Sequence, residues 1–328
     1  MKTMNCRKKG KGKMIRTLRF VLGLCGLVLL GEVVHAQVSK PYNHRYDPPW
    51  DNVVQEGTPF TIYGIDNAPD FHGDINNPDL VVFFAGNQYM VVPELLDAFK
   101  TEYPKYKRIF AETIPPGIEE RQVKSGVLVL GNMRIQLKPD VITAGKGSIE
   151  KNEALGWFSR TEAYAKNRLA IMVSKGNPKN INSLQDLGRS DVNVSMPNPE
   201  WEGIGRRITK AYENVGGEAL KTKIMKEKVG EGTTYLTTIH HRETPLSIMY
   251  NRSDAGPVWY SEAFYHSQLT DHPLEMVTIP NDVNVGATYV VGQMKNAQHP
   301  EAAKDFIEFL TSDKGQAIYK KYGFITVK

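Results

Sequence analysis

Cysteine is almost absent from this 328-residue chain, because its two cysteines, Cys6 and Cys25, both lie near the N-terminus. The sequence from residue 37 to the end contains none. That part of the chain therefore cannot form a disulfide, attach haem through paired thiols or use a thiol nucleophile.

Long apolar runs are also scarce. The run from Phe20 to Leu30 is too short to span a bilayer, and no second run approaches the roughly 18 residues that a membrane helix needs. With 41% hydrophobic, 23% charged and 9% aromatic residues, the composition excludes disordered, collagen-like and coiled-coil proteins. It is typical of a globular protein with one large or two medium domains.

Signatures of common enzyme classes are missing as well. The chain has no Gly-x-Ser-x-Gly elbow, no His-Glu-x-x-His helix and no phosphate-binding glycine-rich loop. An exported Ser/His/Asp hydrolase is therefore a poor explanation, and we predict a protein that is not an enzyme and has no cofactor. The basic stretch from Lys210 to Lys228 contains interspersed Glu, which indicates a solvated helical face and no nucleic-acid partner.

Positive charge is concentrated at the N-terminus. Eight Lys and Arg residues in positions 2–19 precede the apolar run, which is followed by Val34-His35-Ala36. This order defines a secretory signal peptide over residues 1–36, so we expect cleavage after Ala36 and a periplasmic product without membrane insertion. Cleavage would change the net charge from +5 to −2, because the segment holds eight basic residues and one acidic residue. Leu24 is not small, which argues against a lipid anchor at Cys25.

Strand and helix patterns alternate along the rest of the chain. Residues 37–79, rich in Pro, Asn and aromatics, are expected to form an irregular N-terminal arm. A continuous apolar run over 79–85 predicts a buried strand, and the spacing of Val92, Leu95, Leu96 and Phe99 predicts a helix with one buried face. Further strands are expected at 107–111, 139–144, 168–173 and 192–195, and helices at 118–128, 204–215 and from Pro300. This alternation predicts an α/β fold with a mostly parallel sheet.

Four segments carry a wider pattern: the tail from Phe306 to Phe324, the strand Pro139–Ala144, the crossing strand Asn167–Ile171 and the Asp-Ala-Gly segment Asp254–Tyr260. Together they resemble type II periplasmic solute-binding proteins of ABC transporters, and among them the molybdate-binding family. Their order and spacing match the family, and the resemblance covers residues 80–328.

The resemblance implies two Rossmann-like α/β lobes joined by two hinge strands. Lobe 1 would comprise residues 80–170 and 284–328, and lobe 2 residues 171–283. A small molecule, of which an oxyanion of the molybdate or tungstate type is the first candidate, would be held between the lobes of a monomer and delivered to an ABC permease. The alternative is a sensing or accessory subunit of the same fold that works with a signalling or redox partner.

The candidate binding residues lie in turns that follow predicted strands, where helix N-termini present backbone N–H groups to anions. They are Gly86, Asn87, Gln88, Thr113, Gly145, Trp201 and Gly203. The resemblance adds Tyr260, which follows the Asp-Ala-Gly segment, as a ligand contact. Each also has a structural alternative: tight turns at the glycines, a helix cap at Asn87, a buried turn hydroxyl at Thr113 and core packing at Tyr260.

A second group of candidates is the run His240-His241-Arg242-Glu243. Arg242 is the best candidate for neutralising an anionic ligand. His240, His241 and Glu243 are alternative metal ligands, although successive residues of a helix would point in different directions. Four acidic residues, Glu119, Glu120, Glu200 and Glu202, lie near the same turns; they would favour a cationic or zwitterionic solute if they faced the ligand, or stabilise helix first turns if they did not.

Overall fold

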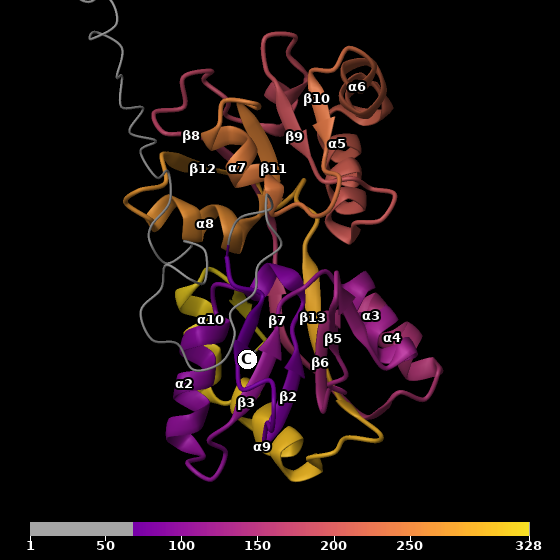
Figure 1. The fold of residues 1–328 in the computed structure, drawn as a ribbon. Helices are drawn as coiled ribbons and strands as arrows, with labels where there is room; N and C mark the ends of the chain where they lie inside the picture. The colour runs from indigo at the N-terminus through magenta and orange to yellow at the C-terminus, as the bar shows by residue number, and fades with distance from the viewer. Residues whose placement is uncertain (1–67, 328) are drawn as a thin grey trace, which may run out of the picture. The chain divides into compact units, whose positions relative to one another are not determined.

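Two β-sheets with surrounding helices organise the chain in the computed structural model, which describes residues 68–327 (Figure 1). One sheet has seven strands, the other has five, and a separate pair is formed by β4 (Leu128–Leu130) and β5 (Met133–Ile135). The expected signal peptide and residues 37–67 of the expected arm lie outside the described residues. None of the helices within residues 68–327 combines the length and apolar character that crossing a membrane requires.

The seven-stranded sheet is built from both ends of the described chain, in the order β1-β3-β2-β6-β13-β7-β14. Its strands are β1 (Phe71–Gly73), β2 (Leu80–Phe83), β3 (Ile109–Glu112), β6 (Val141–Gly145), β7 (Phe158–Asn167), β13 (Ala287–Met294) and β14 (Ile325–Thr326). Every residue of β2 and β3 is buried, as expected for strands covered on both faces.

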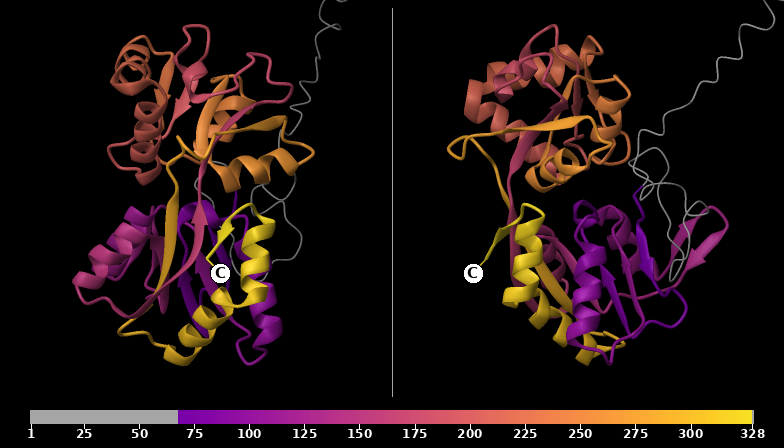
Figure 2. Two further views of the ribbon diagram at one scale, coloured as in Figure 1. Left: turned by 180° about the vertical axis from the view of Figure 1, so that it is seen from behind. Right: turned by 90° about the vertical axis from the view of Figure 1, so that its left-hand side faces the viewer.

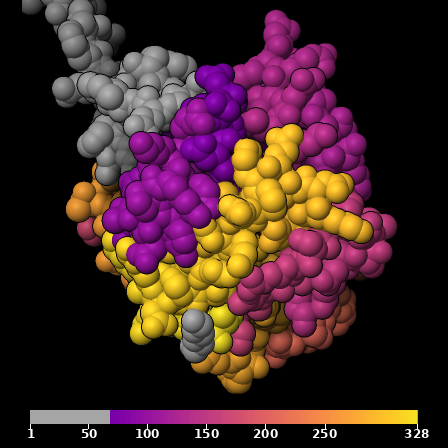
Figure 3. Space-filling model, turned by 90° about the horizontal axis from the view of Figure 1, so that it is seen from below, coloured from indigo at the N-terminus to yellow at the C-terminus, as the bar shows by residue number. Residues whose placement is uncertain are grey.

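Helices from distant parts of the sequence pack together on this sheet. They are η3 (Gly86–Gln88), α2 (Val92–Glu102), α3 (Pro116–Ser125), α4 (Lys146–Ala154), α9 (Pro300–Thr311) and α10 (Asp313–Lys321). The predicted apolar face of α2 is buried, and Phe99 meets Phe306 of α9 edge to face at 5.1 Å between ring centroids. Figure 3, which shows the molecule from below, has the yellow C-terminal residues between purple and magenta segments.

The five-stranded sheet has the order β10-β9-β11-β8-β12. Its strands are β8 (Leu169–Ser174), β9 (Val194–Met196), β10 (Thr234–Leu236), β11 (Ala255–Trp259) and β12 (Leu274–Thr278). The helical segments associated with it are η4 (Leu184–Gly188), α5 (Gly203–Thr222), η5 (Lys223–Glu227), α6 (Lys228–Gly230), α7 (Glu243–Met249) and α8 (Tyr260–Gln268). The helix predicted over residues 204–215 is followed by a kink, because Gly216 and Gly217 leave helical geometry and Gly217 has φ of 66°.

Two segments cross from one sheet to the other, which gives the chain its two-lobe α/β fold (Figure 2). The first crossing joins β7 to β8, and the second joins β12 to β13. Asn284 ties the crossings together: its Oδ1 accepts from the backbone N–H of Leu169 and its Nδ2 donates to the Leu169 carbonyl, both at 2.9 Å.

Two expectations about the strands need correction. The arm is not irregular throughout, because Phe71–Gly73 pairs antiparallel with β3 and extends the sheet. The sheets are also not mostly parallel: β2 is parallel to β3 and β6, and β9 to β10 and β11, but β8 and β13 are antiparallel to both of their neighbours. A strand that enters a sheet from a crossing segment approaches it from the opposite end, which reverses its direction.

Candidate ligand-binding site

Arg242 is a buried cation, 3% exposed, that connects the two lobes. It immediately precedes α7, which packs beside the five-stranded sheet. Its Nη1 donates to Asp70 Oδ1 at 2.8 Å, to the Thr113 carbonyl at 3.0 Å and to the Gly86 carbonyl at 3.3 Å. Its guanidinium also lies over the ring of Tyr89, 4.5 Å from the centroid.

The acceptors of Arg242 lie at the carboxyl ends of two parallel strands. Gly86 follows β2 and Thr113 follows β3. Ligands of open α/β sheets bind at this edge. The structure therefore brings together three of the residues singled out in the sequence, Gly86, Thr113 and Arg242.

Gly86 and Thr113 are both held tightly. A Cβ atom at Gly86 would lie 3.0 Å from the Thr113 carbonyl oxygen and 3.3 Å from Cε1 of His240, so a side chain there would press on both neighbours. The backbone N–H of Thr113 donates to the Asp70 carbonyl at 2.9 Å, and its hydroxyl donates to Asp70 Oδ1 at 3.3 Å. Asp70 thus fixes the turn after β3 as well as pairing with Arg242.

Asn87 and Gln88 make hydrogen bonds with buried tyrosines. Nδ2 of Asn87 donates to the Tyr289 hydroxyl at 2.5 Å. Nε2 of Gln88 donates to the Tyr164 hydroxyl at 2.5 Å, and its Oε1 accepts from the Tyr319 hydroxyl at 2.7 Å. Gln88 therefore joins η3 to β7 and α10 through both ends of its amide.

The remaining candidates lie at the starts of helices or in the loops before them. Gly145 precedes α4, Gly203 is the first residue of α5, and Trp201 is 52% exposed. Tyr260 begins α8, with its ring stacked on Phe264 and covered by the Arg168 guanidinium at 4.1 Å.

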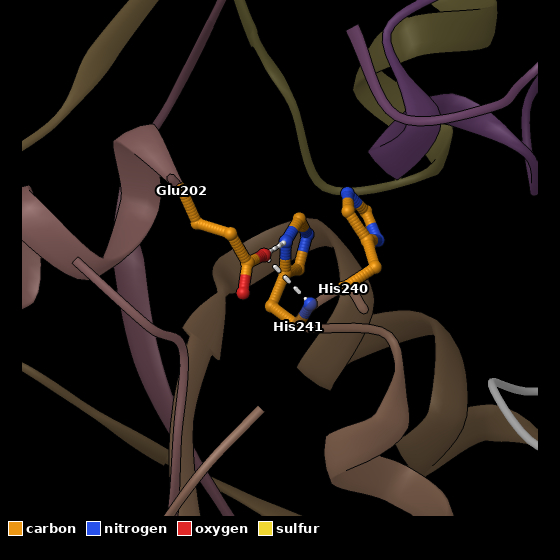
Figure 4. Close-up of side chains that lie close together, drawn as sticks. All are labelled: Glu202, His240 and His241. Atoms are coloured by element: carbon orange, nitrogen blue, oxygen red, sulfur yellow. Dashed lines mark hydrogen bonds and ion pairs between the residues drawn. The ribbon is translucent and has the colours of Figure 1, made fainter. Parts of the chain in front are cut away.

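His241 lies between two buried carboxylates. Its backbone N–H and its ring Nδ1–H both donate to Glu202 Oε2 at 2.7 Å (Figure 4). Its Nε2 is 3.2 Å from Glu262 Oε2, although the pair lacks hydrogen-bond geometry. Burial lowers the pKa of His241, but Glu262 and Glu202 more than offset this and raise it to about 10. This side chain is therefore a cation at neutral pH.

His240 differs from its neighbour. Burial, together with the nearby charges of His241 and Arg242, holds the pKa of His240 well below its ordinary value. The rings of His240 and His241 lie 3.9 Å apart between centroids. A neutral imidazole thus lies against a charged one, and it retains a lone pair that can accept a hydrogen bond or bind a metal.

Glu202, and not Glu243, is the acidic residue that lies beside both His240 and His241. One ligand atom each from Glu202, His240 and His241 lies within 4.8 Å of the others, a spacing compatible with a metal ion. Glu243 Oε1 instead accepts from the backbone N–H groups of Ile239 at 2.6 Å and His240 at 3.0 Å. It stabilises the turn that enters α7.

The other acidic residues divide between the interior and the surface. Burial raises the pKa of Glu112 to about 8, and that of Glu119 well above its ordinary value. Burial thus favours the protonated form of both carboxyl groups, which can donate a hydrogen bond. Glu120 pairs with Lys124 and Lys151, and Glu200 is exposed.

Sequence reasoning missed three residues of the site. Asp70 lies in the segment expected to be irregular, and Tyr89 follows the Gly86–Gln88 turn without a distinguishing motif. Glu262 lies in the first turn of α8, two residues after Tyr260. Its place two residues after Tyr260, itself a candidate, is the one signal that could have identified it.

The comparisons with known proteins agree with the two-lobe fold. The profile of the family described as bacterial extracellular solute-binding protein matches residues 80–325. The chain belongs to this family. The family and the fold are those of proteins that bind small solutes outside the cytoplasm, and the resemblance to type II periplasmic solute-binding proteins is confirmed.

Relatives of this solute-binding protein include molybdate-binding proteins. The molybdate-binding protein ModA of Mycobacterium tuberculosis is 27% identical over 163 residues, which cover 49% of this chain and 55% of the relative. The chain thus spans about half the length of the curated relatives it matches.

Solved structures share the two-lobe fold of this solute-binding protein. The Azotobacter vinelandii periplasmic molybdate-binding protein has a TM-score of 0.61 at 15% identity, covering 76% of this chain and all of that one. The substrate-binding protein of an ABC transporter from Agrobacterium tumefaciens has a TM-score of 0.61 at 14% identity, covering 76% and 79%.

Proposed function

We propose that this solute-binding protein captures a small oxyanion of the molybdate or tungstate class beside Arg242 and delivers it to an ABC permease. The observation that carries the proposal is the placement of a buried guanidinium from one lobe at the strand ends of the other. A guanidinium offers several N–H donors in a fixed plane, which suits the oxygens of a tetrahedral anion.

Buried carboxyl groups near this site could provide further hydrogen-bond donors to an anion. Asp70 balances the guanidinium, while burial raises the pKa of Glu112 and Glu119 and so favours their uncharged forms. Glu112 Oε1 and Glu119 Oε1 are buried and have no hydrogen-bond partner among residues 68–327. Protonated carboxyl groups of this kind can donate to an anion oxygen.

The proposed contacts are Gly86, Asn87, Thr113 and Arg242. The turns at Gly145 and Gly203 and the first turn of α8, which begins at Tyr260, would contribute backbone N–H groups. The N–H of Tyr260 itself donates to the Arg168 carbonyl at 2.7 Å. Two candidates are left out of the proposed site. Both ends of the Gln88 amide are hydrogen-bonded to tyrosines, and the Trp201 side chain is exposed. The protein would act as a periplasmic monomer that releases its ligand unchanged, without turnover.

A thermal-shift screen of the protein with its metals removed tests this function. Molybdate, tungstate, sulfate, phosphate and arsenate would be compared, with the ligand at about 100 times its dissociation constant stabilising by about 2.7 kcal/mol. For a chain of this size, that corresponds to a rise of roughly 5–10 °C in the melting temperature. The variant Arg242→Gln should lose the shift, and Arg168→Gln should keep it. Equal melting temperatures with and without every anion would contradict the proposal.

A further inference from the structure

The cluster of Glu202, His240 and His241 has the composition of a metal site. All three residues are nine-tenths or more buried, and one ligand atom of each lies within 4.8 Å of the others (Figure 4). Two imidazoles with one carboxylate form a donor set that Zn²⁺ and related divalent ions accept in proteins. We propose that this cluster binds one divalent first-row transition ion, with Zn²⁺ as the reference ion.

A buried atom without a partner supports this assignment. Within residues 68–327, His240 Nδ1 has no hydrogen-bond partner, whereas His241 Nε2 faces Glu262 Oε2 at 3.2 Å without hydrogen-bond geometry. Leaving a polar atom such as His240 Nδ1 unpaired away from water costs free energy, and a bound ion would give this ring a partner.

A metal ion would give His240 a partner and join it to His241 and Glu202. It would take the place of the proton on His241 Nδ1, next to Glu202 Oε2, and the displaced proton would pass to solvent. The N–H at His241 Nε2 would continue to face Glu262 Oε2, 3.2 Å away. An imidazole that binds a metal through one nitrogen and donates to a carboxylate through the other is the usual arrangement of histidine ligands.

The carboxylate ligand is already fixed in position. Glu202 Oε1 accepts from the Thr237 hydroxyl at 2.5 Å and from the backbone N–H of Asn198 at 3.2 Å. Its Oε2 is the atom that faces His241. A ligand held in this way loses little conformational freedom when the ion binds.

The proposed ion lies close to the proposed oxyanion site. Cε1 of His240 is 3.3 Å from the position of a Cβ atom at Gly86, whose carbonyl accepts from Arg242. Three protein ligands leave a coordination position open for water or a solute atom. The metal site nevertheless stands on its own residues and does not depend on the oxyanion proposal.

Cobalt titration tests the metal site. The protein would be purified without a polyhistidine tag, treated with a chelator and titrated with Co²⁺, while the visible absorption of the bound ion is recorded. We expect one Co²⁺ per chain and its displacement by one Zn²⁺. Loss of a residue that only supports a metal ligand typically weakens metal binding roughly 10–100-fold. The variants His240→Gln and Glu202→Gln remove ligands themselves, so each should weaken Co²⁺ binding by at least that factor.

His299→Gln is the matched control. His299 also pairs with a carboxylate, with its Nδ1 2.9 Å from Asp140 Oδ2, but it lies outside the cluster. This variant should bind Co²⁺ as the unchanged protein does. Circular dichroism of each variant would separate a lost ligand from a lost fold, and the titration of the unchanged protein remains decisive if a variant does not fold.

Three results would overturn the metal site: no stoichiometric uptake of Co²⁺, uptake unchanged in both cluster variants, or equal weakening in His299→Gln. The oxyanion proposal fails separately. Metal uptake with no response to any oxyanion would contradict the proposed function and support the metal site. If the protein responded to an oxyanion but took up no metal, the result would support the proposed function and contradict the metal site.

Discussion

Replacing Arg242 should reveal how strongly the two lobes are linked. Its Nη1 contacts one carboxylate and two carbonyl oxygens between 2.8 and 3.3 Å. Removing one partner of a buried ion pair typically costs about 3–5 kcal/mol, because the remaining charge loses its compensation. We therefore expect Arg242→Met to lower the free energy of unfolding in urea by about 3–5 kcal/mol.

A double-mutant cycle separates the ion pair from the packing of the side chain. Asp70→Asn combined with Arg242→Met should cost less than the sum of the single changes, with a coupling energy of about 1–3 kcal/mol. Arg168→Met is the control, since that guanidinium lies over the Tyr260 ring and its side chain is only partly buried. If Arg242→Met cost no more than Arg168→Met, the interpretation of Arg242 as a buried link would be refuted.

Three further predictions follow from other contacts. Gln88→Leu leaves the hydroxyls of Tyr164 and Tyr319 without this partner, so we expect a loss of about 2–4 kcal/mol in thermal unfolding, and a loss below about 1 kcal/mol would argue against it. Gly86→Ala places a Cβ atom 3.0 Å from a carbonyl oxygen and should weaken molybdate binding measured by calorimetry, whereas an unchanged affinity would exclude Gly86 from the site. In the metal-free protein the pKa of His241 is raised to about 10, so its contribution to stability is present below about pH 6.5 and is lost as the pH rises towards 10. Urea midpoints of the metal-free protein between pH 6 and 10 should fall less steeply for His241→Gln than for the unchanged sequence, and parallel slopes would contradict this assignment.

The elements that could be predicted from the sequence are those with strong apolar patterns. The buried strand β2 and the amphipathic helix α2 are examples, because their burial is nearly complete along one run or one face. The turn beginning at Ser183 is another, since its capping box with Asp186 depends on local residues alone. In each case the sequence within one segment determines the structure.

The strand β7 was missed because its residues carry no continuous apolar run. It alternates and mixes polar with apolar side chains over Phe158–Asn167, and much of it is partly exposed. Its place in the sheet comes from pairing with β13, which lies more than a hundred residues later in the chain. Antiparallel pairing of this kind depends on the path of the whole chain and leaves no local signal.

In the site, too, local features could be predicted from the sequence and long-range contacts could not. Gly86, Thr113 and Arg242 could be proposed from turns and charge, but the ion pair of Arg242 with Asp70 joins positions 172 residues apart. Gln88 was taken for a ligand donor because its tyrosine partners lie 76 and 231 positions away. A polar side chain in a turn has the same appearance in sequence whether it faces a ligand or completes a buried network.

Direct observation of a bound heavy oxyanion tests the central claim most sharply. A crystal of the protein grown with tungstate would be measured at the tungsten absorption edge, where the metal of the anion gives an anomalous signal. We predict one strong anomalous peak beside Arg242, at the carboxyl ends of β2 and β3. A peak elsewhere, or none at a concentration well above that of the protein, would contradict it.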